Sequence, residues 1–170
     1  MTSIPFPPPR WTNQPLIVYH GTTDIAAAAI LSNGVRVASG RSRTDFGPGF
    51  YTTTLERQAR SWAWLLSNRV AGTRPAVLRF DIDRDQLAAL QSIAFVRGDF
   101  DAEEYWSFLV HCRSGMNNHA RAATPYYDVV FGPLAASWQQ RAIIQDADQV
   151  SFHTQAAETV VNKSGGRLWP

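Results

Sequence analysis

Residues 45–54, Asp-Phe-Gly-Pro-Gly-Phe-Tyr-Thr-Thr-Thr, constrain the fold more than any other stretch of this chain. Two glycines around a proline predict a sharp bend, because glycine reaches backbone conformations that strain other residues. The aromatic and β-branched residues that follow are typical of a strand. Earlier in the chain, His20 ends a short apolar run at residues 16–19. The two stretches together indicate a pocket, although a tight turn with a buried tyrosine explains the second one equally well.

Composition indicates one globular domain with a substantial core. Of the 170 residues, 45% are hydrophobic and 18% are charged, and the formal net charge is only +2. Most of the 16 basic residues are arginines, which suit phosphate groups, but no dense basic run argues for nucleic acid. A single cysteine, Cys112, excludes an internal disulfide. We find neither a transmembrane run nor a signal-peptide pattern, and we expect a cytoplasmic protein without membrane contact.

Hydrophobic spacing and turn residues predict an α+β domain over residues 16–161, between a proline-rich arm at residues 1–15 and a tail at residues 162–170. The expected strands cover residues 16–20, 50–53, 75–82, 93–96, 126–131, 142–144 and 150–152. The expected helices cover residues 25–33, 55–68, 83–90, 101–114 and 155–161.

Individual residues carry further expectations. Thr54 and Asp101 are expected to cap helices, and Asp45 is expected to cap its own turn. Trp62 is expected in the core, and Gly132 with Pro133 is expected to end a strand. One loop carries three arginines that would meet a phosphate or face solvent, namely Arg36, Arg41 and Arg43.

The sequence gives little support for metal-dependent or serine-hydrolase chemistry. The histidines at positions 111, 119 and 153 lack the spacing of metal ligands. The chain also lacks the G-x-S-x-G element that presents a nucleophilic serine in many hydrolases. We therefore expect no metal in the site.

Several short motifs occur in a fixed order along the chain. They are Tyr19-His20-Gly21-Thr22, residues 45–52, Gln58-Ala59-Arg60-Ser61-Trp62-Ala63, residues 127–135 and residues 149–154. In this order they resemble the bacterial ADP-ribosyltransferases of the diphtheria-toxin-like class, and more narrowly an uncharacterised toxin-like bacterial group within it. The resemblance covers residues 16–161.

This resemblance implies an ADP-ribosyltransferase-like fold, in which two small, mainly antiparallel sheets with flanking helices form an NAD cleft. It implies catalytic roles for His20, Tyr51 and Gln149. His20 would bind a ribose hydroxyl, Gly21 would offer its backbone amide and carbonyl to the nicotinamide carboxamide, and Tyr51 would stack on the nicotinamide ring. The implied NAD-binding residues are His20, Gly21, Thr22, Phe46, Gly47, Gly49, Phe50 and Tyr51.

Gln149 stands where the class has an acidic residue. Breaking the nicotinamide–ribose bond builds positive charge on the ribose, which a carboxylate offsets and a neutral amide does not. Asp146 or Asp148, close in sequence, would supply the charge, or the acceptor would need less help.

Three hypotheses therefore stay open. The first is a transferase toxin that passes ADP-ribose from NAD to a protein or nucleic-acid acceptor, with an antitoxin as partner. The second is a module that binds NAD or ADP-ribose without catalysis. The third is an RNA 2′-phosphotransferase-like enzyme, which would need an arginine where this chain has Tyr19.

Overall fold

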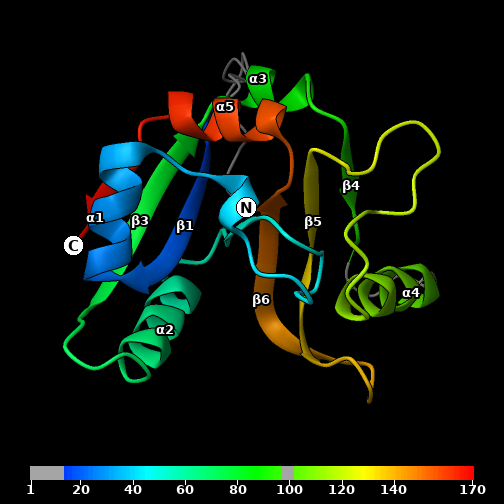
Figure 1. Cartoon of the computed structure of the whole chain (residues 1–170), viewed down its shortest axis with the longest axis horizontal. Coiled ribbons are helices and arrows are strands. Elements are labelled where there is room, and N and C mark those ends of the chain that lie inside the picture. The colour runs from blue at the N-terminus through cyan, green and yellow to red at the C-terminus, as the bar shows by residue number, and fades with distance from the viewer. Residues whose placement is uncertain (1–13, 97–101) are drawn as a thin grey trace, which may run out of the picture.

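The computed structural model describes residues 14–96 and 102–170 (Figure 1). The strands are β1 (Leu16–Thr23), β2 (Phe50–Thr52), β3 (Pro75–Ile82), β4 (Ser92–Ala94), β5 (Val129–Ser137), β6 (Ala142–Phe152) and β7 (Arg167–Trp169). The helices are α1 (Asp24–Asn33), α2 (Glu56–Ser67), α3 (Arg84–Ala88), α4 (Ala102–Arg113) and α5 (Gln155–Lys163), with a 3-10 turn, η1 (Val37–Ser39). None of the helices in these ranges is long and apolar enough to cross a bilayer.

The strands form two small sheets, which confirms the predicted α+β class. Sheet A has the order β1-β3-β7 and is antiparallel, and sheet B has the order β2-β6-β5-β4, in which β4 and β5 run parallel. The sheets meet where Tyr19 and Thr53 exchange two backbone hydrogen bonds of 2.8 and 2.9 Å. Figure 1 shows α1 and α2 against sheet A, α4 at the far end of sheet B, and α5 across the top.

Each sheet buries residues according to the alternation of its strands. The larger core cluster fills the space between the sheets and includes Val18, Phe50, Leu78, Phe80 and Phe152. A second cluster lies between sheet B and α4 and includes Phe46, Tyr105, Leu109 and Val130. Strand β2 therefore contributes one side chain to each cluster, Phe50 to the one between the sheets and Tyr51 to the one under α4.

Helix α1 matches its predicted range of residues 25–33 to within one residue. The hydroxyl of Thr23 accepts a hydrogen bond from the N–H of Ala26, and Gly34 ends the helix with a φ of 79°. Strand β3 and helix α5 also match their predicted positions closely, because their own residues and the residues beside them indicate where they begin and end.

Helix α2 differs from its prediction in two ways. Thr54 does not cap it, because the Thr54 N–H and hydroxyl bind Asp148 instead, and the helix begins after Leu55 without a side-chain cap. Trp62 is 48% exposed rather than in the core, since the helix turns Ala59 and Ala63 toward sheet A. These small residues allow a close approach of α2 to the sheet.

Strands β5 and β6 are longer than predicted. Gly132 and Pro133 lie inside β5, and one continuous β6 replaces the two short strands expected at residues 142–144 and 150–152. The carbonyl of Phe131 accepts a hydrogen bond from the N–H of Phe95, just after β4. Backbone groups two residues apart on a strand point the same way, so an N–H at position 133 would point past the end of β4. Proline therefore interrupts no ladder bond there.

Strand β1 also continues past its predicted end at His20, through Thr23. Residues 167–169, expected within a tail, form β7 and pair with β3. Trp169 packs on Tyr19 with ring centroids 6.0 Å apart, and the guanidinium of Arg79 lies 4.6 Å from its ring. The expected cap at Asp101 and most of the proline-rich arm lie outside the described residues.

Replacing Gly21 by alanine should destabilise the domain strongly. A Cβ at this position would lie 2.0 Å from the backbone carbonyl oxygen of Ala59, so α2 would have to move away from sheet A. We expect Gly21→Ala to lower the free energy of unfolding by about 3 kcal/mol, measured by urea denaturation. Gly165→Ala is the control, because it meets no atom within 4 Å and only adopts a φ of 63°. Equal losses in the two variants would contradict the packing argument.

Candidate functional site

His20 lies at the seam between the two sheets. Its ring packs against Phe50 with centroids 4.5 Å apart, and its Nδ1 donates a 2.7 Å hydrogen bond to the backbone carbonyl of Tyr51. Burial lowers the pKa of His20, with the bond to Tyr51 opposing the shift, and this favours the neutral form of the ring. Because Nδ1 carries the proton, Nε2 is an acceptor, and no group in residues 14–96 or 102–170 bonds to it. This nitrogen can accept a hydrogen bond from a ligand hydroxyl.

The backbone of Gly21 adds a donor and an acceptor beside His20. Tyr19 exchanges its bonds with Thr53 on the outer edge of β1, whereas the N–H of Asp24 points to the β3 side. Since the residues of a strand alternate, the N–H and C=O of Gly21 point to the outer edge, as those of Tyr19 do. Gly21 is buried, and within the described ranges no group bonds to it on that edge. Unpaired buried peptide groups are unfavourable, so this edge favours a ligand with a complementary donor and acceptor.

Three side chains hold the loop before β2 through its carbonyl groups. The carbonyls of residues 46–48 accept hydrogen bonds from His119 Nε2, the Tyr51 hydroxyl and His153 Nδ1, at 2.8, 2.7 and 2.7 Å. The loop approaches β6 closely at Gly49, where a Cβ would lie 2.6 Å from the His153 ring. Neither histidine was predicted to hold this loop, because the spacing of the histidines was weighed only for metal binding. Their true partners are backbone groups far away in the chain.

Tyr51 lies on the face of β2 away from the His20 ring. Its neighbour Phe50 contacts that ring, and successive side chains of a strand point to opposite faces. The Tyr51 hydroxyl also accepts from the N–H of Phe46 at 2.9 Å, and burial raises its pKa. In this structure Tyr51 therefore orders the loop, and it reaches His20 only through its backbone carbonyl. Its stacking role stays a prediction.

Gln149 shares a face of sheet B with Tyr51 and is part of a buried polar network. Its Nε2 donates to Asp45 Oδ2 at 2.7 Å and to the Pro133 carbonyl at 3.3 Å, and Asp45 forms an ion pair with Arg113. The exposed fractions of Gln149 and Asp45 are 7% and 3%. Asp45 is therefore not the turn cap that was predicted, because its carboxylate binds distant side chains. The network joins the loop to β6 and α4.

Asp148 organises the start of α2. Its Oδ1 accepts from the Thr53 hydroxyl at 2.6 Å and the Thr54 N–H at 2.9 Å, and its Oδ2 accepts from the Thr54 hydroxyl. Gln58 exchanges two further hydrogen bonds with the Asp148 backbone, of 2.8 and 3.0 Å. Both carboxylate oxygens are thus engaged by protein groups. Asp146, the other carboxylate considered, has a side chain that is 77% exposed.

The remaining predicted residues divide between the two sides of β2. Phe50 lies with His20 at the seam, and Thr22 is buried nearby in β1, whereas Phe46 is fully buried under α4. The structure therefore brings His20, Gly21 and Phe50 together, and it places Tyr51, Phe46 and Gln149 on the opposite side.

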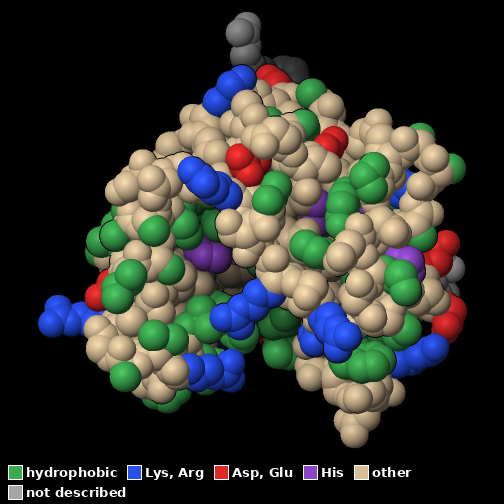
Figure 2. Space-filling view, viewed as in Figure 1, with side chains coloured by type: hydrophobic (Ala, Val, Ile, Leu, Met, Phe, Trp, Pro, Cys, Tyr) green, Lys and Arg blue, Asp and Glu red, His purple; other side chains and the backbone are tan. Residues whose placement is uncertain are grey.

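Trp62 is a candidate site residue that the sequence analysis placed in the core. It follows Gln58 by one helical turn, so it lies on the side of α2 that faces β6. Figure 2 shows the surface hollowed between the part that holds α1 and α2 and the part that holds β6, with Lys and Arg side chains along its lower margin. An exposed indole on this side of α2 offers an aromatic face to a ligand.

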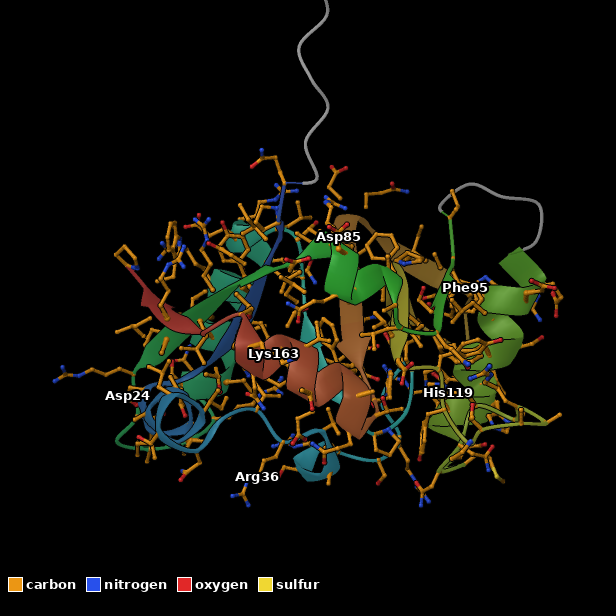
Figure 3. The ribbon with its side chains drawn as sticks, turned by 90° about the horizontal axis from the view of Figure 1, so that it is seen from above. Asp24, Arg36, Asp85, Phe95, His119 and Lys163 are labelled. Atoms are coloured by element: carbon orange, nitrogen blue, oxygen red, sulfur yellow. The ribbon has the colours of Figure 1, made fainter. Side chains whose placement is uncertain are left out.

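The arginines of the loop after α1 are exposed, so they face solvent in this structure, and their contact with a phosphate stays a prediction. Figure 3 shows Arg36 pointing outward, away from the core, and Arg41 and Arg43 are also exposed. The same view shows His119 and Phe95 on the side of the molecule that holds α4. Across the described ranges, no group of three or more histidine, cysteine or acidic side chains could hold a metal ion.

These observations define an α+β domain whose two sheets meet at a histidine and an unpaired peptide edge. Residues 16–145 match the profile of a family described as a protein of unknown function, DUF3990. The match covers well over half of the chain, and the protein therefore belongs to this family. A comparison with curated proteins gave no match.

The buried histidines should make stability depend on pH. Burial lowers the pKa of His153 to about 3 and also lowers that of His119. Unfolded histidine binds a proton below about pH 6.5, whereas the folded form of His153 does so only near pH 3. The stabilisation from a neutral His153 is therefore complete above about pH 6.5 and is lost as the pH falls toward 3, by up to about 1.4 kcal/mol per pH unit, and His119 adds a loss of the same sign.

Urea denaturation between about pH 6 and 4.5 measures this dependence. His153→Gln should reduce the slope of the unfolding free energy against pH by about 1.4 kcal/mol per pH unit, which corresponds to one proton. A comparison at pH 8, where histidine is neutral in both states, separates lost packing from the proton effect. An unchanged slope in the variant would contradict a neutral, buried His153.

Gln149→Glu should destabilise the domain rather than add a useful carboxylate. The new carboxylate would face Asp45, whose Oδ2 lies 2.7 Å from the present amide nitrogen. We expect a loss of about 3 kcal/mol in unfolding free energy at pH 8, since a buried charge would lack a partner. Gln149→Met removes the hydrogen bond without adding charge and should lose about 1–2 kcal/mol. If the Glu variant is as stable as the parent in urea denaturation, the Asp45 contact is wrong.

Proposed function

We propose that this protein is an NAD-dependent ADP-ribosyltransferase with its NAD site at the seam between the sheets. The observation that carries the proposal is the unpaired N–H and C=O of Gly21 beside the His20 ring. A primary carboxamide, such as that of nicotinamide, presents one acceptor and one donor that match this pair. The ordered motifs around His20 and Tyr51 support the same class.

Residues at the seam would bind and orient NAD as substrate. Gly21 would hold the carboxamide through its backbone, and Nε2 of His20 would accept from a ribose hydroxyl. The exposed indole of Trp62 would offer a face to the pyridine ring. Fixing both ends of the nicotinamide–ribose bond lowers the entropic barrier to breaking it.

The reaction would proceed by departure of nicotinamide with the electron pair of its bond to ribose. The acceptor nucleophile would then bond to the ribose carbon and release its proton to solvent. Gln149 and Asp148 are both engaged elsewhere, so the proposal assigns the charge-stabilising role to neither. A carboxylate or phosphate of the acceptor would supply that charge.

The proposed setting is a bacterial toxin that acts in the cytoplasm of the producing cell or of a target cell. Its acceptor would be a protein or a nucleic acid. An antitoxin that covers the seam would then protect the producing cell.

A second candidate function is a module that binds NAD or ADP-ribose without turnover. The burial of Gln149 at 7% exposure and its bond to Asp45 favour this candidate, because a neutral amide stands where the class has an acidic residue and the carboxylate of Asp148 is already engaged by Thr53 and Thr54. The seam would still bind the carboxamide through Gly21.

Nicotinamide release from NAD, with and without cell lysate, tests both candidates. We expect lysate-dependent release by the parent and about 100-fold less by His20→Ala, because the ribose would no longer be held in place. His111→Ala is the control, since His111 lies on α4 and binds Asn118. Calorimetric binding of NAD without release would favour the module, and absence of binding would contradict both candidates.

A further inference from the structure

Three exposed arginines lie in the loop between α1 and β2, namely Arg36, Arg41 and Arg43. Within residues 14–96 and 102–170, none of their guanidinium groups donates a hydrogen bond or forms an ion pair. Single surface arginines commonly face solvent, but unpaired positive charges that lie close together in one loop attract anions. The loop therefore has binding capacity that the fold itself does not use.

The acidic side chains that belong to this loop or bind it are already engaged. Asp45 is buried and forms its ion pair with Arg113. Glu158 of α5 accepts hydrogen bonds from the N–H of Val37 at 2.8 Å and from the side chain of Gln155 at 2.9 Å. Even when Glu158 is counted against the three arginines, the loop keeps an excess of two positive charges.

A contact between two glycines brings one of these arginines to the seam. A Cβ on Gly40 would lie 2.3 Å from the backbone nitrogen of Gly49, so the two backbone segments touch. Gly49 directly precedes Phe50, whose ring centroid lies 4.5 Å from that of His20. Arg41 directly follows Gly40. The backbone of Arg41 is therefore held beside the start of β2, next to the proposed ribose-binding histidine.

The other two arginines are held away from the seam. The side chain of Arg43 lies along the end of α4, where a Cβ on Gly115 would be 3.3 Å from its Nε. Arg36 follows Val35, whose N–H and C=O bind the side chain of Asn162 on α5 at 2.7 and 3.0 Å. Figure 3 shows Arg36 pointing outward. Three residues of one type in one loop thus have different neighbours, and only Arg41 adjoins the seam.

We propose that Arg41 binds the pyrophosphate of a dinucleotide or of ADP-ribose held at the seam. In these ligands the phosphate is attached to the ribose, so a ribose bound at His20 would present its phosphate to the adjoining loop. A guanidinium group matches two phosphate oxygens at once and keeps its charge at any physiological pH. This placement rests on the proposed NAD site, whereas the binding of the phosphate does not require turnover.

Calorimetry with ADP-ribose tests the contact, because this ligand carries the pyrophosphate and has no nicotinamide to release. We expect Arg41→Gln to weaken ADP-ribose binding by about tenfold, through loss of a charge-assisted hydrogen bond. Nicotinamide riboside has the ribose but no phosphate, and its affinity should be the same for the parent and Arg41→Gln. Arg41→Lys should lie between the two, since it keeps the charge and loses the two-pronged geometry.

Arg36→Gln and Arg43→Gln are the matched controls, because each removes the same charge from the same loop. At about 0.15 M salt, exposed charges more than about 8 Å apart are largely screened, so each control should change ADP-ribose affinity by about twofold or less. All three side chains are exposed, and circular dichroism verifies that each variant folds.

Several outcomes would overturn the inference. They are no ADP-ribose binding by the parent, full affinity in Arg41→Gln, equal losses in the three glutamine variants, and an equal loss for nicotinamide riboside. Equal losses would indicate the general field of the loop rather than a contact at Arg41. Arg41-dependent binding of a short oligonucleotide, with unchanged affinity for ADP-ribose, would also overturn it by placing the phosphate on a nucleic acid.

Nicotinamide release, measured separately, distinguishes this inference from the proposed function. ADP-ribose binding that depends on Arg41, without any release from NAD, would keep the phosphate contact and reject the transferase. Release from limiting NAD that is equal in the parent and in Arg41→Gln would keep the transferase and reject the phosphate contact.

Discussion

The rest of the domain depends on the two backbone hydrogen bonds between Tyr19 and Thr53. They fix the edge of β1 against the end of β2 and so set how the two sheets meet. The strands are antiparallel at this bridge, so β1 beyond Tyr19 runs alongside β2, which pairs with β6 instead and leaves the edge of β1 at Gly21 without a backbone partner in the described residues. Asp148 closes the same corner by binding the hydroxyl of Thr53 and the N–H of Thr54. The seam is thus formed by backbone groups and is held in place by the partly buried carboxylate of Asp148.

The loop at residues 45–49 is ordered by the nearby Tyr51 and by side chains from distant parts of the chain. His119, Tyr51 and His153 bind its carbonyl groups, and Arg113 binds its aspartate. All three carbonyl partners are uncharged donors in a buried region, so the loop avoids the penalty of burying unpaired charge. The loop therefore packs beneath α4 and supports β2, and it does not enter the seam.

Elements with complete local signals could be predicted from the sequence, and contacts between distant segments could not. The caps of α1 and the bounds of β3 follow from neighbouring residues. Thr54 satisfies every local rule for a helix cap, yet it binds Asp148, which lies 94 residues further along the chain. Trp62 suggested a core position by size, but the glycine in β1 lets small alanines face the sheet instead. The site roles of His20 and Gly21 stay predictions of the resemblance, and the strand geometry shows that the edge at Gly21 is unpaired in the described residues.

The unpaired edge of β1 also has a consequence for how the protein can evolve. Its donor and acceptor belong to the peptide backbone at Gly21, and any side chain there would strike α2 rather than the edge. A substitution other than proline can therefore change stability at this position, but it leaves the N–H and C=O of this edge in place.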